Sequence, residues 1–222
     1  MEKTIIFFIF RFIYNKIKHT NLMTQNMRSP GKGFLGIIAK TLMLSFNKAV
    51  INDAVNRLNI KRNEKIIEIG SGNGEAIEKM LQLTKKEIMG IEISDVFREG
   101  LIKKFKELNV SFYSNDAKNL KKIIPNNTID KLLAVNVIYF LDPLEDYAKE
   151  FYRILNLNGF GILACKFEGI KNFNTLTAPN KDLKGVTKIF EKVGFNVSSE
   201  LVNLGNDQSK YYAIRIRKVS NE

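Results

Sequence analysis

Histidine and cysteine are nearly absent from this chain, and their scarcity excludes several kinds of chemistry. The 222 residues include one cysteine, Cys165, and one histidine, His19. A single cysteine cannot form a disulfide framework or a cysteine cluster around a metal ion. Because the histidine lies in the N-terminal tail, a triad or metal centre built on a core histidine is excluded as well. We therefore predict a site without a metal ion.

The N-terminal apolar run is too short to cross a membrane. Residues 5–14 are apolar apart from Arg11. A helix rises 1.5 Å per residue, so this run extends only about 15 Å, against a hydrocarbon core of roughly 30 Å. Arg11 also interrupts the stretch that a secretory signal would need, and no small-residue cleavage site precedes Thr20.

The net charge of +12 is concentrated near the N-terminus. Residues 1–65 contain 12 Lys or Arg and 3 Asp or Glu, whereas residues 66–222 contain 23 and 20. We divide the chain into a basic, apolar extension (1–28), a helical segment that packs on the core (29–62) and an α/β domain (63–222). The extension has three interpretations: a segment in a membrane interface, a targeting peptide, or a disordered tail. We expect a cytoplasmic protein, peripheral to a membrane under the first interpretation, and mitochondrial targeting stays open under the second.

A strand that runs into three alternating glycines is the most informative motif. Residues 65–69 are mainly apolar and β-branched, Gly70, Gly72 and Gly74 follow, and apolar side chains then recur at helical spacing. Such a turn lets a ligand approach the backbone, because glycine has no Cβ and the helix start offers unpaired N–H groups. In the dinucleotide pattern G-x-G-x-x-G the third glycine would fall at Glu75. A carboxylate is a poor neighbour for a pyrophosphate, which argues against a nicotinamide oxidoreductase.

Acidic residues follow the next two predicted strands. The apolar run 88–91 ends in Glu92, and the run 110–113 is followed by Asp116. A carboxylate at the tip of the second strand can accept two hydrogen bonds from a ribose diol. Strands that alternate with amphipathic helices favour a parallel sheet covered on both faces. The sequence therefore predicts an α/β fold with a nucleotide-like ligand at the carboxyl ends of its strands.

The order of these motifs resembles the class I S-adenosylmethionine (SAM)-dependent methyltransferases, and in particular the ubiquinone/menaquinone-biosynthesis type. The resemblance covers roughly residues 50–218, and Glu68-x-Gly70-x-Gly72-x-Gly74 is similar to the family's first motif. It implies a Rossmann-like, doubly wound sheet, mostly parallel with one antiparallel strand near the C-terminus and helices on both faces. It also implies SAM as the cofactor.

The resemblance further implies in-line methyl transfer to a small, lipophilic molecule, without a protein nucleophile. The enzyme would hold the acceptor about 3 Å from the methyl carbon in a dry site. In the family, the residue at Glu92 binds the ribose, that at Asp116 binds adenine, and the loop 169–179 often contributes to the substrate pocket. Tyr139 is a candidate catalytic residue. The residues expected to bind SAM are Glu68, Gly70, Ser71, Gly72, Gly74, Glu92, Ile93, Asp116, Ala117 and Asn136.

Two further functions stay open: a non-catalytic SAM-fold binding or assembly protein, and an RNA methyltransferase. The positive charge suggests RNA, but the nearly neutral core and the lack of an appended RNA-binding module disfavour a nucleic-acid partner. The Asn/Asp-Pro-Pro-Tyr signature of enzymes that methylate exocyclic or amide nitrogens is also missing, because the matching place reads Asn136-Val137-Ile138-Tyr139.

Overall fold

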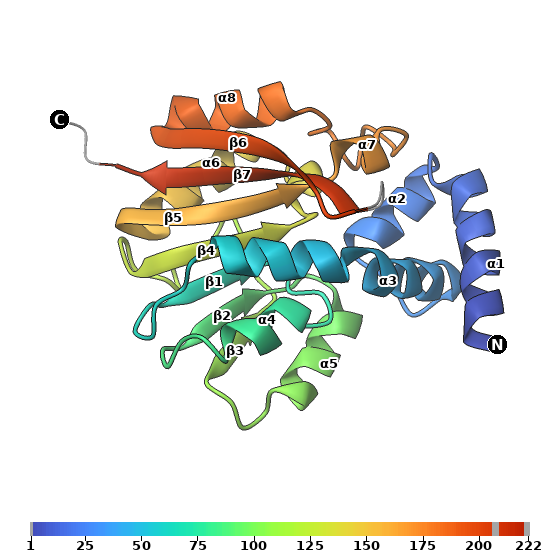
Figure 1. Cartoon of the computed structure of the whole chain (residues 1–222), viewed down its shortest axis with the longest axis horizontal. Helices are drawn as coiled ribbons and strands as arrows, with labels where there is room; N and C mark the ends of the chain where they lie inside the picture. The colour runs from blue at the N-terminus through green and yellow to red at the C-terminus, as the bar shows by residue number, and fades with distance from the viewer. Residues whose placement is uncertain (1, 206–208, 220–222) are drawn as a thin grey trace.

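The computed structural model describes residues 2–205 and 209–219, and its centre is one seven-stranded sheet (Figure 1). The strands lie in the order β3-β2-β1-β4-β5-β7-β6. They are β1 (Ile66–Ile69), β2 (Ile88–Ile91), β3 (Val110–Tyr113), β4 (Ile129–Val135), β5 (Leu155–Cys165), β6 (Phe195–Asn203) and β7 (Lys210–Lys218).

One strand near the C-terminus runs against its neighbours. Within the described chain, β7 is antiparallel to both β5 and β6, whereas the pairs from β3 across to β5 are parallel. Parallel strands need crossover connections, and helices supply them. The predicted Rossmann-like fold with one antiparallel strand is confirmed.

Helices cover both faces of the sheet, with the second half of α3 in front of it and α6 behind it in Figure 1. The helices are α1 (Glu2–Ile17), α2 (Asn21–Arg28), α3 (Phe34–Arg57), α4 (Glu75–Met80), α5 (Asp95–Lys104), α6 (Leu144–Ile154), α7 (Phe167–Ile170) and α8 (Leu183–Val193), with a 3₁₀ turn η1 (Ile138–Phe140).

Strand β1 shows why three of its four residues are apolar, with Glu68 as the exception. Successive side chains of a strand point to opposite faces, so Ile66 packs with α3, α4 and α5 while Ile67 packs with α6 and its neighbours. Both residues are fully buried. A strand covered on both faces reads as a continuous apolar run and not as an alternating one.

The N-terminal extension forms helices packed on α3, and the disordered-tail interpretation does not describe it. Met23 of α2 is fully buried with Ile38 and Leu42 of α3, and Phe10 and Tyr14 of α1 pack on this cluster. The first half of α3 thus packs against α1 and α2, and its second half packs against the sheet. The predicted boundary at residue 28 separates helices that pack together.

Helix α3 is long and apolar enough to cross a membrane, judged by length and composition alone. Its second half is instead a layer of the core, since Val50, Ala54 and Val55 are buried against the sheet side. This burial accounts for the apolar residues of the second half alone, since only 28% of the candidate span is buried.

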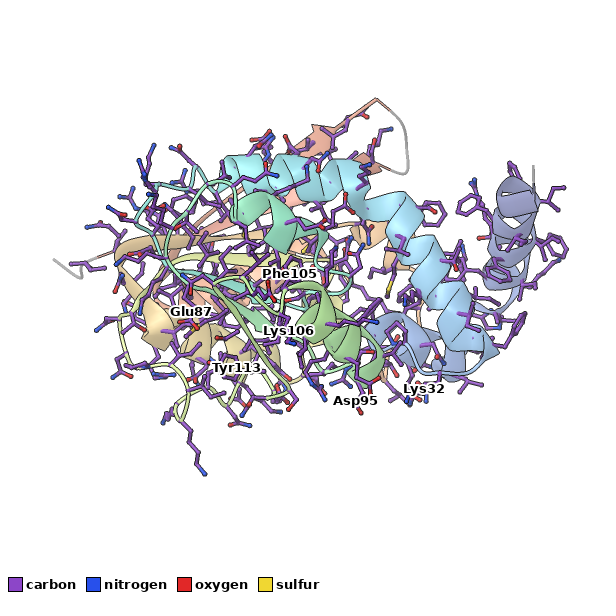
Figure 2. The ribbon with its side chains drawn as sticks, turned by 90° about the horizontal axis from the view of Figure 1, so that it is seen from below. Lys32, Glu87, Asp95, Phe105, Lys106 and Tyr113 are labelled. Atoms are coloured by element: carbon purple, nitrogen blue, oxygen red, sulfur yellow. The ribbon has the colours of Figure 1, made fainter. Side chains whose placement is uncertain are left out.

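Residues 29–33 form a hinge that connects α2 to α3. Figure 2 shows Lys32 of the hinge next to Asp95, which begins α5. A hydrogen bond of 3.0 Å joins the two segments, because the Ser94 hydroxyl donates to the Pro30 carbonyl. The hinge is therefore fixed at the carboxyl end of β2.

Candidate functional site

The glycine loop between β1 and α4 lies where the strand order reverses. β1 pairs with β2 on one side and with β4 on the other, which opens a crevice at the carboxyl ends of these strands. Gly72 and Gly74 both have positive φ, a conformation that L side chains rarely adopt. A Cβ at Gly72 would meet no atom within 4 Å, whereas one at Gly74 would lie 2.5 Å from the Phe105 ring. Gly72 therefore faces open space, and Gly74 packs against α5.

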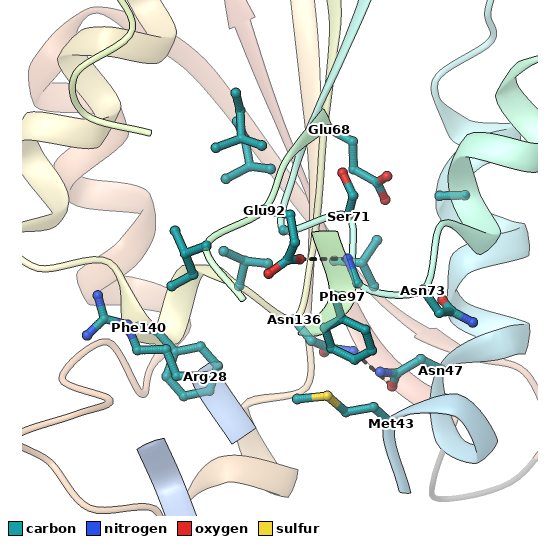
Figure 3. Close-up of a pocket in the computed structure, with 18 of the residues that line it drawn as sticks. Arg28, Met43, Asn47, Glu68, Ser71, Asn73, Glu92, Phe97, Asn136 and Phe140 are labelled. Carbon is teal, nitrogen blue, oxygen red and sulfur yellow. Dashed lines mark hydrogen bonds between the residues drawn. The ribbon is translucent and has the colours of Figure 1, made fainter. Parts of the chain in front are cut away.

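A cavity of about 160 Å³ fills this crevice (Figure 3). Gly74 does not line it, so its expected contact with SAM has no support in the geometry. The other predicted SAM-binding residues come together around the cavity: Glu68, Gly70, Ser71, Gly72, Glu92, Ile93, Asp116, Ala117 and Asn136.

Glu92 fixes the glycine loop to the end of β2. Its Oε2 accepts the Gly72 N–H at 2.8 Å, and its Oε1 accepts the Ser94 N–H at 2.7 Å. Burial raises the pKa of Glu92 above its usual value, although both backbone N–H groups favour the charged form. Each carboxylate oxygen keeps a second lone pair. Glu92 can therefore accept ribose hydroxyls without releasing the loop.

Glu68 is a buried carboxyl whose Oε2 has no hydrogen-bond partner among the described residues. Neither its Oε2 nor the Ser71 Oγ has a hydrogen bond within the described residues. Burial raises the pKa of Glu68 well above its usual value, the nearby Ser71 hydroxyl opposes this shift only in part, and the charge of Glu92 adds to it. Buried polar atoms normally have partners, so these two indicate a polar ligand in the cavity. The sulfonium and ammonium groups of SAM are cationic and suit a carboxylate.

Asp116 and Ala117 follow β3 at the far side of the cavity. The Asp116 Oδ1 accepts the Lys118 N–H at 3.3 Å, and the side chain is 40% exposed. Ile93, which is 43% exposed, is the apolar residue after Glu92. This arrangement suits an adenine ring with its amino group at Asp116, which stays a prediction.

Helices α2 and α3 close the cavity from the N-terminal side. Met27 and Arg28 of α2 line it together with Met43 and Asn47 of α3 (Figure 3). The sequence did not identify these residues: Met27 and Arg28 lie in the extension, and Met43 and Asn47 lie in the segment that was expected to pack on the core. A polar Asn47 within an apolar helix was a signal that could have found one of them.

Asn136 connects the cofactor cavity to a polar network. Its backbone is left-handed, with φ of 57°, which asparagine tolerates better than most residues. Its Nδ2 donates to the Asn47 Oδ1 at 3.0 Å, and its Oδ1 accepts the Tyr139 hydroxyl at 2.9 Å. The Tyr139 oxygen in turn accepts the Lys166 N–H. Burial raises the pKa of Tyr139 well above its usual value, so this hydroxyl stays protonated and serves to position Asn136.

A second cavity of about 240 Å³ lies beside the first, and Met27, Met43, Asn47, Asn136 and Phe140 line both. Its other lining residues come from α1, the middle of α3, η1 and the segment after β5: Arg11, Tyr14, Asn15, Phe46, Tyr139, Lys166, Gly169, Ile170 and Phe173. Gly169, Ile170 and Phe173 of the predicted polar loop 169–179 thus line the second cavity.

The comparisons with known proteins agree with this geometry. Residues 67–163, from β1 to β5, match the family described as "Methyltransferase domain". Residues 67–163 thus form a methyltransferase domain, and the fold around them is that of the class I SAM-dependent methyltransferases. SAM is the cofactor of this domain, and methyl transfer is the chemistry of such domains.

The names of two curated relatives indicate very different substrates, an RNA and a sterol. Ribosomal RNA small subunit methyltransferase A of Mycoplasmopsis synoviae is 29% identical over 121 residues, covering 54% of this chain and 45% of the relative. Sterol 24-C-methyltransferase erg6 of Aspergillus fumigatus is 27% identical over 116 residues, covering 48% and 29%. The chain thus spans less than half the length of either relative, and these matches do not choose between RNA and a small molecule.

A solved structure shows the same fold. The N-methyltransferase NodS of Bradyrhizobium japonicum WM9, in complex with S-adenosyl-L-homocysteine (SAH), matches 78% of this chain and 88% of its own. The TM-score is 0.64 and the sequence identity 13%. At this identity the likeness concerns the fold.

Proposed function

We propose that this protein transfers the methyl group of SAM to a small, lipophilic acceptor that binds in the second cavity. The observation that carries the proposal is the pair of adjoining cavities. One is lined by the predicted cofactor residues, and the other is lined mainly by apolar side chains, such as Met43, Phe46, Phe140, Ile170 and Phe173. An apolar pocket with a few polar groups is typical of small-molecule sites.

The residues of the site would act by positioning. SAM supplies an electrophilic methyl group, and its transfer needs alignment and exclusion of water more than a protein nucleophile. Glu92 and the glycine loop would hold the nucleoside, and Glu68 would face the cationic end. Asn136 lies between the two cavities, where its left-handed backbone and its bonds to Asn47 and Tyr139 fix it.

The direct test is transfer of an isotopically labelled methyl group. The full chain would be incubated with labelled SAM and a panel of lipids and quinone precursors, and the products would be followed by mass spectrometry. Gly72→Val is the matched inactive control, because a side chain at this position enters the cofactor cavity. Label in a small, apolar product with the parent chain alone is expected. Binding of SAM without transfer to any acceptor would favour the non-catalytic binding protein.

An RNA methyltransferase is the second candidate, and the ribosomal RNA relative and the positive charge favour it. Residues of α1, α2 and α3 line the two cavities and partly enclose them, which favours an acceptor smaller than an RNA. The same labelled SAM with total RNA decides between the two. Label in RNA that disappears as salt is raised would support RNA as the substrate.

We also propose that α1 touches an anionic membrane surface, so that the cytoplasmic protein is peripheral to a membrane. Ile5, Phe8, Ile9 and Phe12 recur at helical spacing and are 51–65% exposed. Lys16 lies over the Phe12 ring at 5.8 Å. An exposed apolar stripe beside cations suits an interfacial helix, which binds weakly and reversibly.

A further inference from the structure

Lys166 is a partly buried cation that lines the second cavity. It follows β5 directly, and its backbone N–H donates to the Tyr139 hydroxyl. Its Nζ donates to the Phe46 carbonyl at 2.7 Å and to the Asn47 Oδ1 at 3.2 Å. An ammonium group has three donors. Two of them are used by these neutral acceptors, which leaves one for a ligand.

Lys166 meets no carboxylate in this cavity, because no Asp or Glu belongs to its lining among the described residues. The nearest acid along the chain, Glu168, is exposed on α7 and does not line the cavity. Burial lowers the pKa of Lys166 to about 8, because the charged amine has lost water without gaining a carboxylate. Most of the Lys166 side chains are still charged at pH 7.

We propose that Lys166 binds an anionic oxygen on the methyl acceptor, so that the acceptor is a lipophilic acid: a phenolate, an enolate or a carboxylate. This inference rests on the proposed small-molecule function and adds the chemical class. The apolar walls accommodate the body of the molecule, and the one remaining N–H of the ammonium takes its charged end. A neutral acceptor would leave that donor without a strong partner.

The structure also explains how Lys166 is held for this role. Asn47 receives hydrogen bonds from both Lys166 and Asn136, and Asn136 lines both cavities. The ammonium group therefore has a fixed place relative to the cofactor cavity. An acceptor anchored at Lys166 is oriented toward the cofactor by the same network.

Binding of matched probes to the full chain tests the proposal. With SAH at saturation, calorimetry would compare octanoate with octanol, and 4-nitrophenolate with 4-nitroanisole. We expect at least one of the two anions to bind about tenfold more tightly than its neutral partner, as one charge-assisted hydrogen bond implies. The two pairs distinguish a carboxylate from a phenolate as the preferred group.

Variants separate a direct contact from a structural role. Lys166→Met should abolish the preference for the anion, while Lys166→Arg should retain it. The matched control is Lys171→Met, which removes an exposed lysine five residues away. SAH binding by every variant shows that the cofactor site is folded, and loss of SAH binding by the parent chain would instead count against the proposed function.

The pH dependence provides a readout that a structural role would not change. The preference for octanoate should fall as the pH rises through about 8, where Lys166 loses its proton. The other ionisable groups facing it do not titrate there: arginine keeps its charge, and burial raises the pKa values of Tyr14 and Tyr139 above their usual range. No preference for either anion in the parent chain, no binding of either anion, or a preference that survives in Lys166→Met would each overturn the proposal.

Discussion

Replacement of Glu68 by glutamine should make the protein without bound SAM more stable and should lower its affinity for SAM. Glu68 is 3% exposed, and its Oε2 has no hydrogen-bond partner in the described part of the chain. A buried group in this condition costs about 1 to 3 kcal/mol. Glutamine keeps the shape, removes the charge and offers an amide that can donate to the Ser71 hydroxyl, which lies beside it in Figure 3.

The size of this stabilisation depends on pH. Because the folded pKa of Glu68 is raised, the folded protein binds this proton more tightly than the unfolded chain does. The stability that comes from the protonated form is complete below the ordinary pKa and is lost as the pH rises through the raised value. Glu68→Gln should therefore match the parent near pH 4 and exceed it by roughly 1 to 3 kcal/mol at pH 8.

Thermal unfolding of the free protein at both pH values measures this difference. For a chain of this size, 1 kcal/mol corresponds to about 2 to 4 °C in Tm. The control is Glu99→Gln on the exposed side of α5, which should leave Tm nearly unchanged. SAM affinity should fall about fivefold in Glu68→Gln, because a neutral hydrogen bond replaces a charge-assisted one. A lower Tm at pH 8, or unchanged SAM affinity, would refute the reasoning.

Three other perturbations test separate parts of the site. Glu92→Ala removes the acceptor of the Gly72 and Ser94 N–H groups as well as the expected ribose contact, so SAM should bind at least tenfold more weakly by calorimetry. Gly72→Val should weaken SAM binding at least as much with little change in secondary structure by circular dichroism, and normal affinity would show that the cofactor lies elsewhere. Replacing Phe8 and Phe12 together by serine should lower co-sedimentation with anionic vesicles, and an equal loss with Leu157→Ser, an exposed control on β5, would contradict a specific role for α1.

The cofactor half of the site could be predicted because its residues follow short, local patterns. The apolar run of β1, the glycines after it and the acid at Glu92 each lie within a few residues of a strand end. Parallel strands carry such ends to one edge of the sheet, whatever the rest of the chain does. Gly74 shows the limit of this reasoning, since the same spacing that predicts a ligand contact also serves packing against Phe105.

The second cavity could not be predicted in the same way, because it is assembled from distant segments. Asn47 and Lys166 are 119 positions apart, and their hydrogen bond exists because α3 crosses the face of the sheet. No local pattern encodes that crossing. Lys166 had one available signal, a charged residue directly after a buried parallel strand, which is the place where sites of this fold class lie.

The role of the N-terminal extension was harder still to predict, since one short helix both lines a cavity and exposes apolar side chains. On α1, Tyr14 faces the second cavity, whereas Phe8 and Phe12 are exposed. A helix apolar on more than one side has no distinct amphipathic pattern, so composition alone left a membrane-interface segment, a targeting peptide and a disordered tail open. Its contribution to the cavity argues instead that membrane contact and acceptor binding are linked through α1. If α1 binds a membrane surface as proposed, a lipophilic acid in the bilayer interface, with its charged end near the surface, would reach the protein at a raised local concentration.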